Sequence, residues 1–351
     1  MRVVFAILMT LLLAAGCYVP APAIAPGVTA ANAGASATTI APAVATTEPR
    51  VEQVTLAMGY IPSVQFAPLY VAQEKGYFAD AGLEVTFRYG YETDLLKLVA
   101  SGEIPFLVGS GEEVILGRSQ GLPVRSVLRW YRRFPVVLFA KASSGITTPS
   151  DLVGKRVGIP GLFGASYVGW EAILYATGLD ASKVSLQSIG FTQAAAISQN
   201  QVDAALDYVV NGPVQLHLAG EPVVVMPVYE YVDLPSNGII TSDVVIEKRP
   251  DLVRSLVTAV LHGLSDTLED PDGAFETSVR VVPGAGDTQA VVSRAIFDES
   301  LKLWQAEPGQ LGKWDSDMWE QAASFMLEMG LIQKPVDSAE LYSNDFVTDW
   351  K

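Results

Sequence analysis

Strand-like and helix-like segments alternate along the chain from Val51 onward, and this alternation limits the fold more than any other feature. The segment 51–60 alternates in polarity as a strand does, a stripe of apolar residues with helical spacing follows it, and 84–90 is again strand-like. The pattern continues through the short apolar run 106–112 to two strand-like runs within 124–141. Such alternation is typical of a parallel sheet with helices on both faces.

The alternation then restarts, which indicates a second lobe. A short helix and a strand at 156–159 begin a new series of strand–helix pairs, and a long amphipathic helix and a mostly helical remainder close the chain. The folded part has about 300 residues, more than one hydrophobic core usually serves, so we expect an α/β protein of two lobes. We place lobe 1 at residues 51–138 plus 238–351 and lobe 2 at residues 139–237.

The first seventeen residues have the features of a secretory leader. Arg2 precedes a short apolar run, and small residues then lead to Cys17, the only cysteine of the chain, in the sequence LLLAAGC. This arrangement resembles a bacterial lipoprotein signal, so we expect residues 1–17 to form a signal peptide that ends at a lipidated Cys17. A plain secretory leader cut after Ala23–Ala25, with Cys17 discarded, is the alternative.

Residues 18–50 are rich in Ala, Pro and Thr and carry almost no charge. Such a segment cannot bury enough side chain to offset the entropy lost on ordering, so we expect a disordered tether. A lipid at one end and a tether behind it predict a domain held at the outer face of the cell membrane.

Composition argues against several partners and chemistries. The net charge is −15 and the pI is near 4.5, so nucleic acid is not an expected partner. The only histidines are His217 and His262, and neither lies in an H-E-x-x-H motif or beside a serine on a sharp turn. A metal site built on Cys or His is nearly excluded by count. We therefore expect no catalytic residue, no metal and no resident cofactor.

The stretch GIPGLFGASYVGW (158–170) places three glycines between a strand and a helix-like segment. The spacing is G-x-x-G-x-x-G, not the G-x-G-x-x-G of dinucleotide-binding turns, and no Lys–Ser/Thr pair follows as in a P-loop. We expect free N–H groups at the helix start and the Ser166 hydroxyl to bind an anion or a polyol. An ordinary strand-to-helix turn with Ser166 as the N-cap is the alternative.

Aromatic residues gather where the predicted strands end. Tyr60 and Phe66 bracket the first turn, Trp130 lies near the passage between lobes, Phe163 is in the glycine loop and Tyr208 ends a strand. Open α/β sheets bind ligands outside the carboxyl ends of their strands, and flat rings there can stack on a planar ligand. We interpret the cluster as a site for a planar ring system. For any single aromatic, packing in a core is the alternative.

Three blocks of sequence carry a family resemblance. LAMGYIPSVQFAPLYVAQEKGYFADAGLEVTFRYG (56–90), DLVGKRVGIPG (151–161) and VDAALDYVVNGPV (202–214) resemble bacterial ABC-transporter substrate-binding proteins of the ThiY/SsuA-like group. The resemblance implies a periplasmic-binding-protein type II fold, with two α/β lobes joined by two crossing strands and the ligand in the cleft. In this chain the crossings are expected near Val137–Lys141 and Pro235–Ile240, and the glycine loop resembles the turn of lobe 2 that clasps the ligand.

Members of this group bind thiamine-precursor pyrimidines, alkanesulfonates, nitrate, bicarbonate or riboflavin, and a cleft rich in rings disfavours nitrate and sulfonate. Pyrimidine-binding members carry W-x-P-N-x-x-H where this chain has YIPSVQF (60–66), which replaces polar groups with ring surface. The GYIP and GIPGLFGASY segments resemble the riboflavin-binding (RibY-like) branch. The resemblance therefore implies riboflavin as the ligand, with a formylaminopyrimidine-type thiamine precursor as the alternative.

The residues expected to contact the ligand are of two kinds. Ring contacts are expected from Tyr60, Phe66, Trp130, Phe163 and Tyr208. Polar contacts are expected from Gln65, Ser110, Glu112, Ser166, Tyr167, Asn211 and Asn237. Gly164 is expected to let the ligand approach the backbone closely. Glu112 ends the sequence GSGE after a buried strand, where its carboxylate could accept from ribityl hydroxyls or a ring N–H. An acid favoured at a helix start by the helix dipole is the alternative.

The resemblance implies capture without chemistry. A small planar ligand would contact both lobes only when they close, and the closed form of a monomer would dock on a membrane permease driven by a cytoplasmic ATPase. An enzyme of the thiamine-pyrimidine synthase type shares this fold, but it would need a catalytic histidine and usually a cysteine-rich motif. The ligand-sensing domain of a receptor is a further alternative, although no signalling domain follows in the sequence.

Overall fold

The computed structural model describes residues 51–347. The expected signal peptide, the lipidated Cys17 and the tether of residues 18–50 therefore lie outside the described residues. Within residues 51–347 no helix combines the length and the apolar character needed to cross a membrane.

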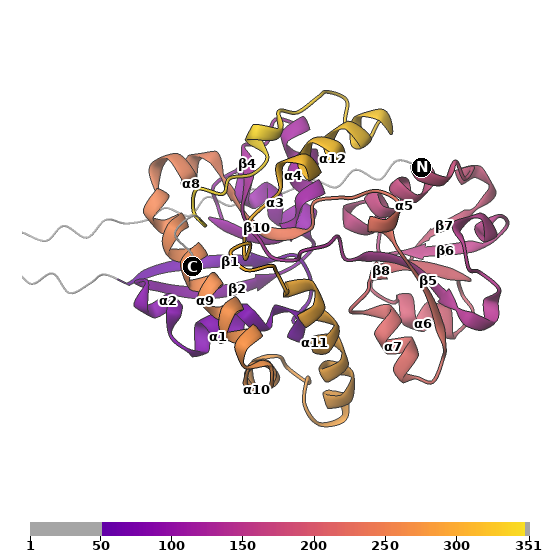
Figure 1. The fold of residues 1–351 in the computed structure, drawn as a ribbon, viewed down its shortest axis with the longest axis horizontal. Coiled ribbons are helices and arrows are strands. Elements are labelled where there is room, and N and C mark those ends of the chain that lie inside the picture. The colour runs from indigo at the N-terminus through magenta and orange to yellow at the C-terminus, as the bar shows by residue number, and fades with distance from the viewer. Residues whose placement is uncertain (1–50, 348–351) are drawn as a thin grey trace, which may run out of the picture. The chain divides into compact units, whose positions relative to one another are not determined.

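Five strands form the sheet of the first lobe, in the order β2-β1-β3-β10-β4 (Figure 1). Their bounds are β1 Glu52–Met58, β2 Leu83–Tyr89, β3 Phe106–Ser110, β4 Val124–Arg129 and β10 Asn237–Ser242. β1 runs parallel to β2 and β3, whereas β10 is antiparallel to β3 and β4. β3 and β10 are buried along their whole length, which explains why neither alternates in polarity.

A second five-stranded sheet, in the order β7-β6-β8-β5-β9, forms the other lobe, which lies at the right of Figure 1. Its strands are β5 Val136–Lys141, β6 Arg156–Ile159, β7 Ser185–Ser188, β8 Ala204–Tyr208 and β9 Val223–Pro227. β6 is parallel to β7 and β8, and β5 is antiparallel to β8 and β9. Each sheet thus contains one inserted antiparallel strand, β10 or β5, which is the first strand that the chain forms after changing lobes.

The helices follow the strands as the alternation predicts. In the first lobe they are α1 Ala67–Glu74, α2 Tyr77–Asp80, α3 Glu92–Ala100 and α4 Gly111–Ser119. The second lobe contributes α5 Gly164–Thr177, α6 Gln193–Ser198 and α7 Gly212–Leu218. The C-terminal part adds α8 Asp243–Lys248, α9 Pro250–Glu269, α10 Pro271–Val281, α11 Ala290–Trp304 and α12 Ser316–Glu328.

The long helix α9 packs directly on α1, and one glycine makes this contact possible. A Cβ placed on Gly263 would lie 2.1 Å from the carbonyl oxygen of Pro68 and 2.8 Å from Cβ of Ala72. Since neither a backbone carbonyl nor a methyl group on a packed helix can move away easily, Gly263 lets the two helix backbones approach closely. Helix α9 is thereby fixed to the first lobe.

The expected two-lobed α/β architecture is confirmed, but the boundary near residue 138 is wrong. The whole of β5, Val136–Lys141, pairs with β8 and β9 of the second sheet. The chain therefore passes between the lobes over residues 130–135, and it returns between Pro227 and Asn237. The apolar run of β5 is buried because it lies inside a sheet, not because it crosses between lobes.

Candidate ligand-binding cleft

A cavity of about 790 Å³, counting the space that opens to solvent, lies between the two lobes. Its wall is built from turns that follow β1, β2, β6, β7 and β8, from the chain passage after β4, and from the start of β10. The cavity thus lies at the carboxyl ends of parallel strands, where the chain leaves the sheets and side chains can converge.

Four aromatic rings meet across the cleft, two from each lobe. Tyr60 and Tyr91 come from the first lobe, and Phe163 and Phe191 come from the second. Tyr91 stacks on Phe191, with centroids 5.3 Å apart and planes at 24°, and its centroid is 5.6 Å from that of Phe163 in an edge-to-face arrangement. Tyr60 contacts Phe191 edge to face at 4.8 Å. Since these rings line the cavity, each lobe contributes apolar ring surface to its wall.

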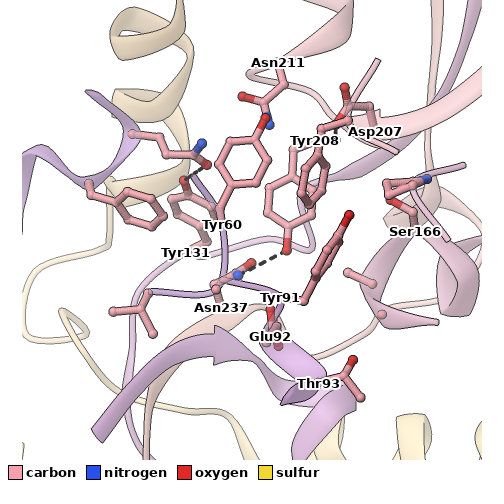
Figure 2. Close-up of a pocket in the computed structure, with 18 of the residues that line it drawn as sticks. Tyr60, Tyr91, Glu92, Thr93, Tyr131, Ser166, Asp207, Tyr208, Asn211 and Asn237 are labelled. Atoms are coloured by element: carbon pink, nitrogen blue, oxygen red, sulfur yellow. Dashed lines mark hydrogen bonds between the residues drawn. The ribbon is translucent and has the colours of Figure 1, made fainter. Parts of the chain in front are cut away.

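Polar side chains lie deeper in the cleft (Figure 2). Asn237 donates from Nδ2 to the Tyr208 hydroxyl at 3.1 Å, and the Tyr131 hydroxyl donates to Oε1 of Gln65 at 3.4 Å. The other amide atoms, Nε2 of Gln65 and Oδ1 of Asn237, are buried without a hydrogen-bond partner among residues 51–347. Buried polar atoms are normally satisfied, so these two are available to hydrogen-bond a ligand or water.

Glu92, the first residue of α3, crosses the end of β1 to reach the end of β3. Its Oε1 accepts from the backbone N–H of Ser110 and from the Ser110 hydroxyl, each at 2.5 Å. Two glycines leave room for it: a Cβ on Gly59 would lie 3.1 Å from Glu92 Oε2, and one on Gly109 would lie 3.0 Å from Glu92 Oε1. Burial, followed by the nearby Glu113, raises the pKa of Glu92 to about 8.

Asp207 is the second acid on the cavity wall, at the end of β8. Its Oδ1 accepts from the backbone N–H of Tyr208 at 2.7 Å, and its Oδ2 accepts from that of Gly212 at 2.9 Å. Burial raises the pKa of Asp207 to about 7 despite these bonds. Burial and the neighbouring Asp207 also raise the pKa of Tyr60, so this tyrosine stays un-ionised.

Ten of the thirteen residues expected to contact a ligand lie on the cavity wall. They are Tyr60, Gln65, Phe66, Trp130, Phe163, Gly164, Ser166, Tyr208, Asn211 and Asn237. The structure thus brings them together from both lobes, and their contact with a ligand stays a prediction.

Ser110, Glu112 and Tyr167 are not part of the wall. Ser110 and Glu112 are fully buried behind Glu92, because the start of α4 turns its side chains into the first lobe. Tyr167 lies beside Glu171 on α5. The acid that faces the cavity at this place is therefore Glu92, not Glu112.

Close packing and one left-handed backbone conformation explain why the loop at 158–164 is rich in glycine. A Cβ on Gly158 would lie 2.4 Å from Cδ1 of Ile189, and one on Gly161 would lie 2.5 Å from the Phe163 ring. Gly164 has φ +73°, a conformation that other residues rarely adopt. Helix α5 begins at Gly164, so Ser166 is inside its first turn and is not the N-cap. The loop thus packs closely and presents Phe163 and Ser166 to the cavity.

Several wall residues were not expected from the sequence: Gly59, Tyr91, Glu92, Thr93, Val108, Tyr131, Pro160, Ala165, Phe191 and Asp207. Two of them could have been found by the strand-end argument, since Tyr91 follows β2 and Phe191 follows β7. Asp207 could have been noticed for another reason, because it is a carboxylic acid within the otherwise apolar sequence of β8.

A family model described as NMT1/THI5 like matches residues 63–274, which is more than half of the chain. The chain belongs to the NMT1/THI5-like family. It is also 40% identical, over 99% of its own length and 98% of the relative's, to the riboflavin-binding protein RibY of Chloroflexus aurantiacus. The formylaminopyrimidine-binding protein of Halalkalibacterium halodurans is 28% identical over 85% of this chain and 91% of the relative.

Among solved structures, this NMT1/THI5-like chain is similar to the periplasmic aliphatic sulphonate binding protein SsuA of Escherichia coli. The TM-score is 0.66 at 14% identity, covering 82% of this chain and 91% of that protein. At this identity the match shows the fold alone, which is that of periplasmic binding proteins. The fold by itself does not separate binding proteins from enzymes, but the likeness over nearly the whole chain to a binding protein is consistent with a substrate-binding protein rather than an enzyme.

Proposed function

We propose that the chain captures riboflavin at the outer face of the cell membrane and delivers it to the permease of an ABC importer. The observation that carries this proposal is the set of rings that both lobes bring to one cavity. Tyr60 and Tyr91 face Phe163 and Phe191 across the cleft. A planar tricyclic ring offers two broad apolar faces, and aromatic side chains from both lobes are at hand to stack on them.

The polar atoms of the cleft suit the rest of the molecule. Riboflavin has a ring edge with carbonyl oxygens, ring nitrogens and one N–H, and it has a ribityl chain with hydroxyl groups. The unpartnered Nε2 of Gln65 and Oδ1 of Asn237 offer one donor and one acceptor. Ser166, in the first turn of α5, adds a hydroxyl from the other lobe. The likeness to a riboflavin-binding protein over nearly the whole chain also supports this ligand.

The proposed mechanism is capture by closure, with no bond made or broken. A ligand that contacts both lobes stabilises the closed arrangement over the open one, because only the closed form makes both sets of contacts. The permease would recognise the closed form, and the ATPase of the importer would drive transport. The role needs no resident cofactor, and lipidation of Cys17 would keep the monomer close to the permease.

A thiamine pyrimidine precursor is the second candidate ligand. It is supported by the 28% identity to a formylaminopyrimidine-binding protein. A single small ring has less surface to stack than a tricyclic ring and would leave part of the aromatic wall without a partner.

Calorimetric titration of the purified protein with each compound tests the proposal. We expect heat release and one-to-one binding with riboflavin, and binding of formylaminopyrimidine that is weaker by at least tenfold. The reverse order of affinities would assign the pyrimidine as the ligand. A protein that is yellow when purified would be further support for a flavin.

A further inference from the structure

The Ser110 hydroxyl lies between two carboxyl groups, and it has only one hydrogen to donate. Its Oγ is 2.5 Å from Oε1 of Glu92 and 2.5 Å from Oε1 of Glu112. Oxygens this close need a hydrogen between them. The hydroxyl supplies one of the two hydrogens, so one of the carboxyl groups must supply the other. At least one of the two glutamates is therefore protonated.

The contacts assign that hydrogen to Glu112. Oε1 of Glu92 also accepts from the backbone N–H of Ser110, so this atom acts as an acceptor. Oε2 of Glu112 is fully buried and has no hydrogen-bond partner among residues 51–347. A negative charge there would be unpaired and costly, whereas the carbonyl oxygen of a neutral acid costs much less. Glu112 thus donates to Ser110 Oγ, and Ser110 Oγ donates to Glu92 Oε1.

This chain of hydrogen bonds leaves Glu92 with one free oxygen. Glu92 lines the cavity (Figure 2). No residue among 51–347 hydrogen-bonds its Oε2, since both of its hydrogen bonds are made by Oε1. The titratable groups near it are Glu112 and Glu113 on α4 and Tyr208 at the end of β8. The nearest lysine on α3, Lys97, acts on Glu113 and pairs with Asp94, and no ion pair joins a cation to Glu92 within residues 51–347.

The direction of the pKa shift agrees with this geometry. Burial and the nearby Glu113 raise the pKa of Glu92 to about 8, and burial together with Glu92 raises the pKa of Glu112. Glu92 is therefore mainly protonated near neutral pH, and the raised pKa of Glu112 agrees with the hydrogen that the contacts assign to it. The hydrogen of Glu92 is then on Oε2, since Oε1 accepts two hydrogen bonds from Ser110.

We propose that Glu92 is a specificity-determining residue which, as a neutral carboxylic acid, donates a hydrogen bond from Oε2 to an acceptor atom of an uncharged ligand. The acceptor is a ring carbonyl oxygen or an unprotonated ring nitrogen. This inference rests on the proposed capture of riboflavin, whose ring edge carries both kinds of atom. Hydrogen bonding to Ser110, which is itself bonded to Glu112, holds Glu92 in place. Because Glu92 is neutral, it gives the cleft no negative charge that would attract a cationic ring.

The test compares riboflavin affinity as a function of pH in the wild-type protein and in Glu92→Gln. The Gln amide keeps one acceptor for Ser110 and one donor for the ligand, but it cannot ionise. We expect wild-type affinity to fall between about pH 7.5 and about pH 9, approaching tenfold per pH unit above the pKa. Glu92→Gln should bind within about threefold of wild type at neutral pH and lack this fall.

An ionised Glu92 that accepts from the ligand gives the opposite result. Wild-type affinity would then be constant or rise with pH, and Glu92→Gln would bind more than about tenfold less tightly. Either outcome overturns the inference. Glu171→Gln, which removes a half-buried acid of α5 outside the cavity wall, is the matched control and should keep the wild-type pH profile.

Failure of the proposed function gives a different result from failure of this inference. If riboflavin does not bind at any pH, the proposed function is wrong. The protonation of Glu92 is then measured in the ligand-free protein by carbon-13 NMR of the glutamate carboxyl groups. A signal that titrates near pH 8 and is missing in Glu92→Gln supports the neutral donor. A Glu92 signal that titrates below about pH 6 overturns it, whatever the ligand.

Discussion

The ring of Tyr91 stacks on the ring of Phe191 across the cleft, with centroids 5.3 Å apart and planes at 24°. The two residues follow β2 of the first sheet and β7 of the second, so their contact joins the lobes at the cavity wall. Both rings are partly exposed, at 44% and 38%. The lobes therefore meet through aromatic faces that a flat ligand can also use.

Replacing Tyr91 with Ala should weaken riboflavin binding by about 2- to 10-fold, since aromatic pairs contribute about 0.5–1.5 kcal/mol. The thermal stability of the ligand-free protein should change little, because the ring is 44% exposed. Calorimetric titration and thermal unfolding measure the two effects. Leu218→Ala removes a similarly exposed apolar side chain from α7 and should leave the affinity unchanged.

The ligand-free protein should lose stability as the pH rises from about 5 to about 8.5. The pKa of Glu92 is raised to about 8 and that of Asp207 to about 7, so the folded state holds protons that the unfolded state has already released. The stability that these two acids contribute is fully present below the pKa that they have in the unfolded chain. It is lost as the pH rises through the pKa that they have in the folded protein. At about 1.4 kcal/mol for each unit of pKa shift, we expect a loss on the order of 5 kcal/mol in the free energy of unfolding.

Denaturant unfolding across this pH range measures the loss. Glu112→Gln should flatten the slope, because it removes one of the acids whose ionisation in the folded state is costly. Glu103→Gln, at an exposed position, should keep the wild-type slope. A wild-type stability that rises steadily to pH 8.5 would contradict the assignment of buried neutral acids.

Gly212→Ala should lower both stability and ligand affinity. The new Cβ would lie 2.7 Å from Asp207 Oδ2 and 2.6 Å from the Phe139 ring. Asp207 must then move away, which weakens the hydrogen bond that it accepts from the backbone N–H of residue 212. We expect a loss of about 1–3 kcal/mol in stability, together with weaker riboflavin binding.

Gly263→Ala is the comparison for that variant, since its Cβ would meet the backbone of Pro68 in the α1–α9 contact. It should destabilise the protein yet leave the affinity of the folded fraction unchanged. Equal losses of affinity in the two glycine variants would show that Gly212 acts only through global stability.

Cys17→Ser should release the protein from the membrane if Cys17 is lipidated. Cell fractionation should find the wild-type chain with the membranes and the variant in the soluble or secreted fraction. Mass spectrometry of the wild-type N-terminus should show acyl chains on the cysteine. A wild-type chain that begins after Ala25 would instead indicate a plain secretory leader.

The two-lobed architecture could be predicted because strand–helix alternation is a local pattern that the burial of each element imposes. The passage between lobes was misplaced because β5 has the same apolar pattern whichever sheet it joins. Only its pairing with β8 and β9 shows where it belongs. Pairing between distant strands leaves no local mark in the sequence.

Strand ends predicted most of the cavity wall and would also have indicated Tyr91 and Phe191, whereas the choice of acid depends on tertiary packing. Glu92 and Glu112 are both acids at the start of a helix, and the sequence gives no means of choosing between them. The choice depends on β1 lying between β2 and β3, which lets Glu92 cross the end of β1 to Ser110. Glu112 is placed behind that contact and away from the cavity.

The most direct test of the account is a titration of riboflavin fluorescence with the purified wild-type protein near neutral pH. Stacking of the flavin on the cleft rings should quench the fluorescence, with one site per chain and a Kd of about 1 μM or tighter. The riboflavin recovered afterwards should be chemically unchanged. Fluorescence that stays constant up to a large excess of protein, or the release of an altered flavin, would contradict the account.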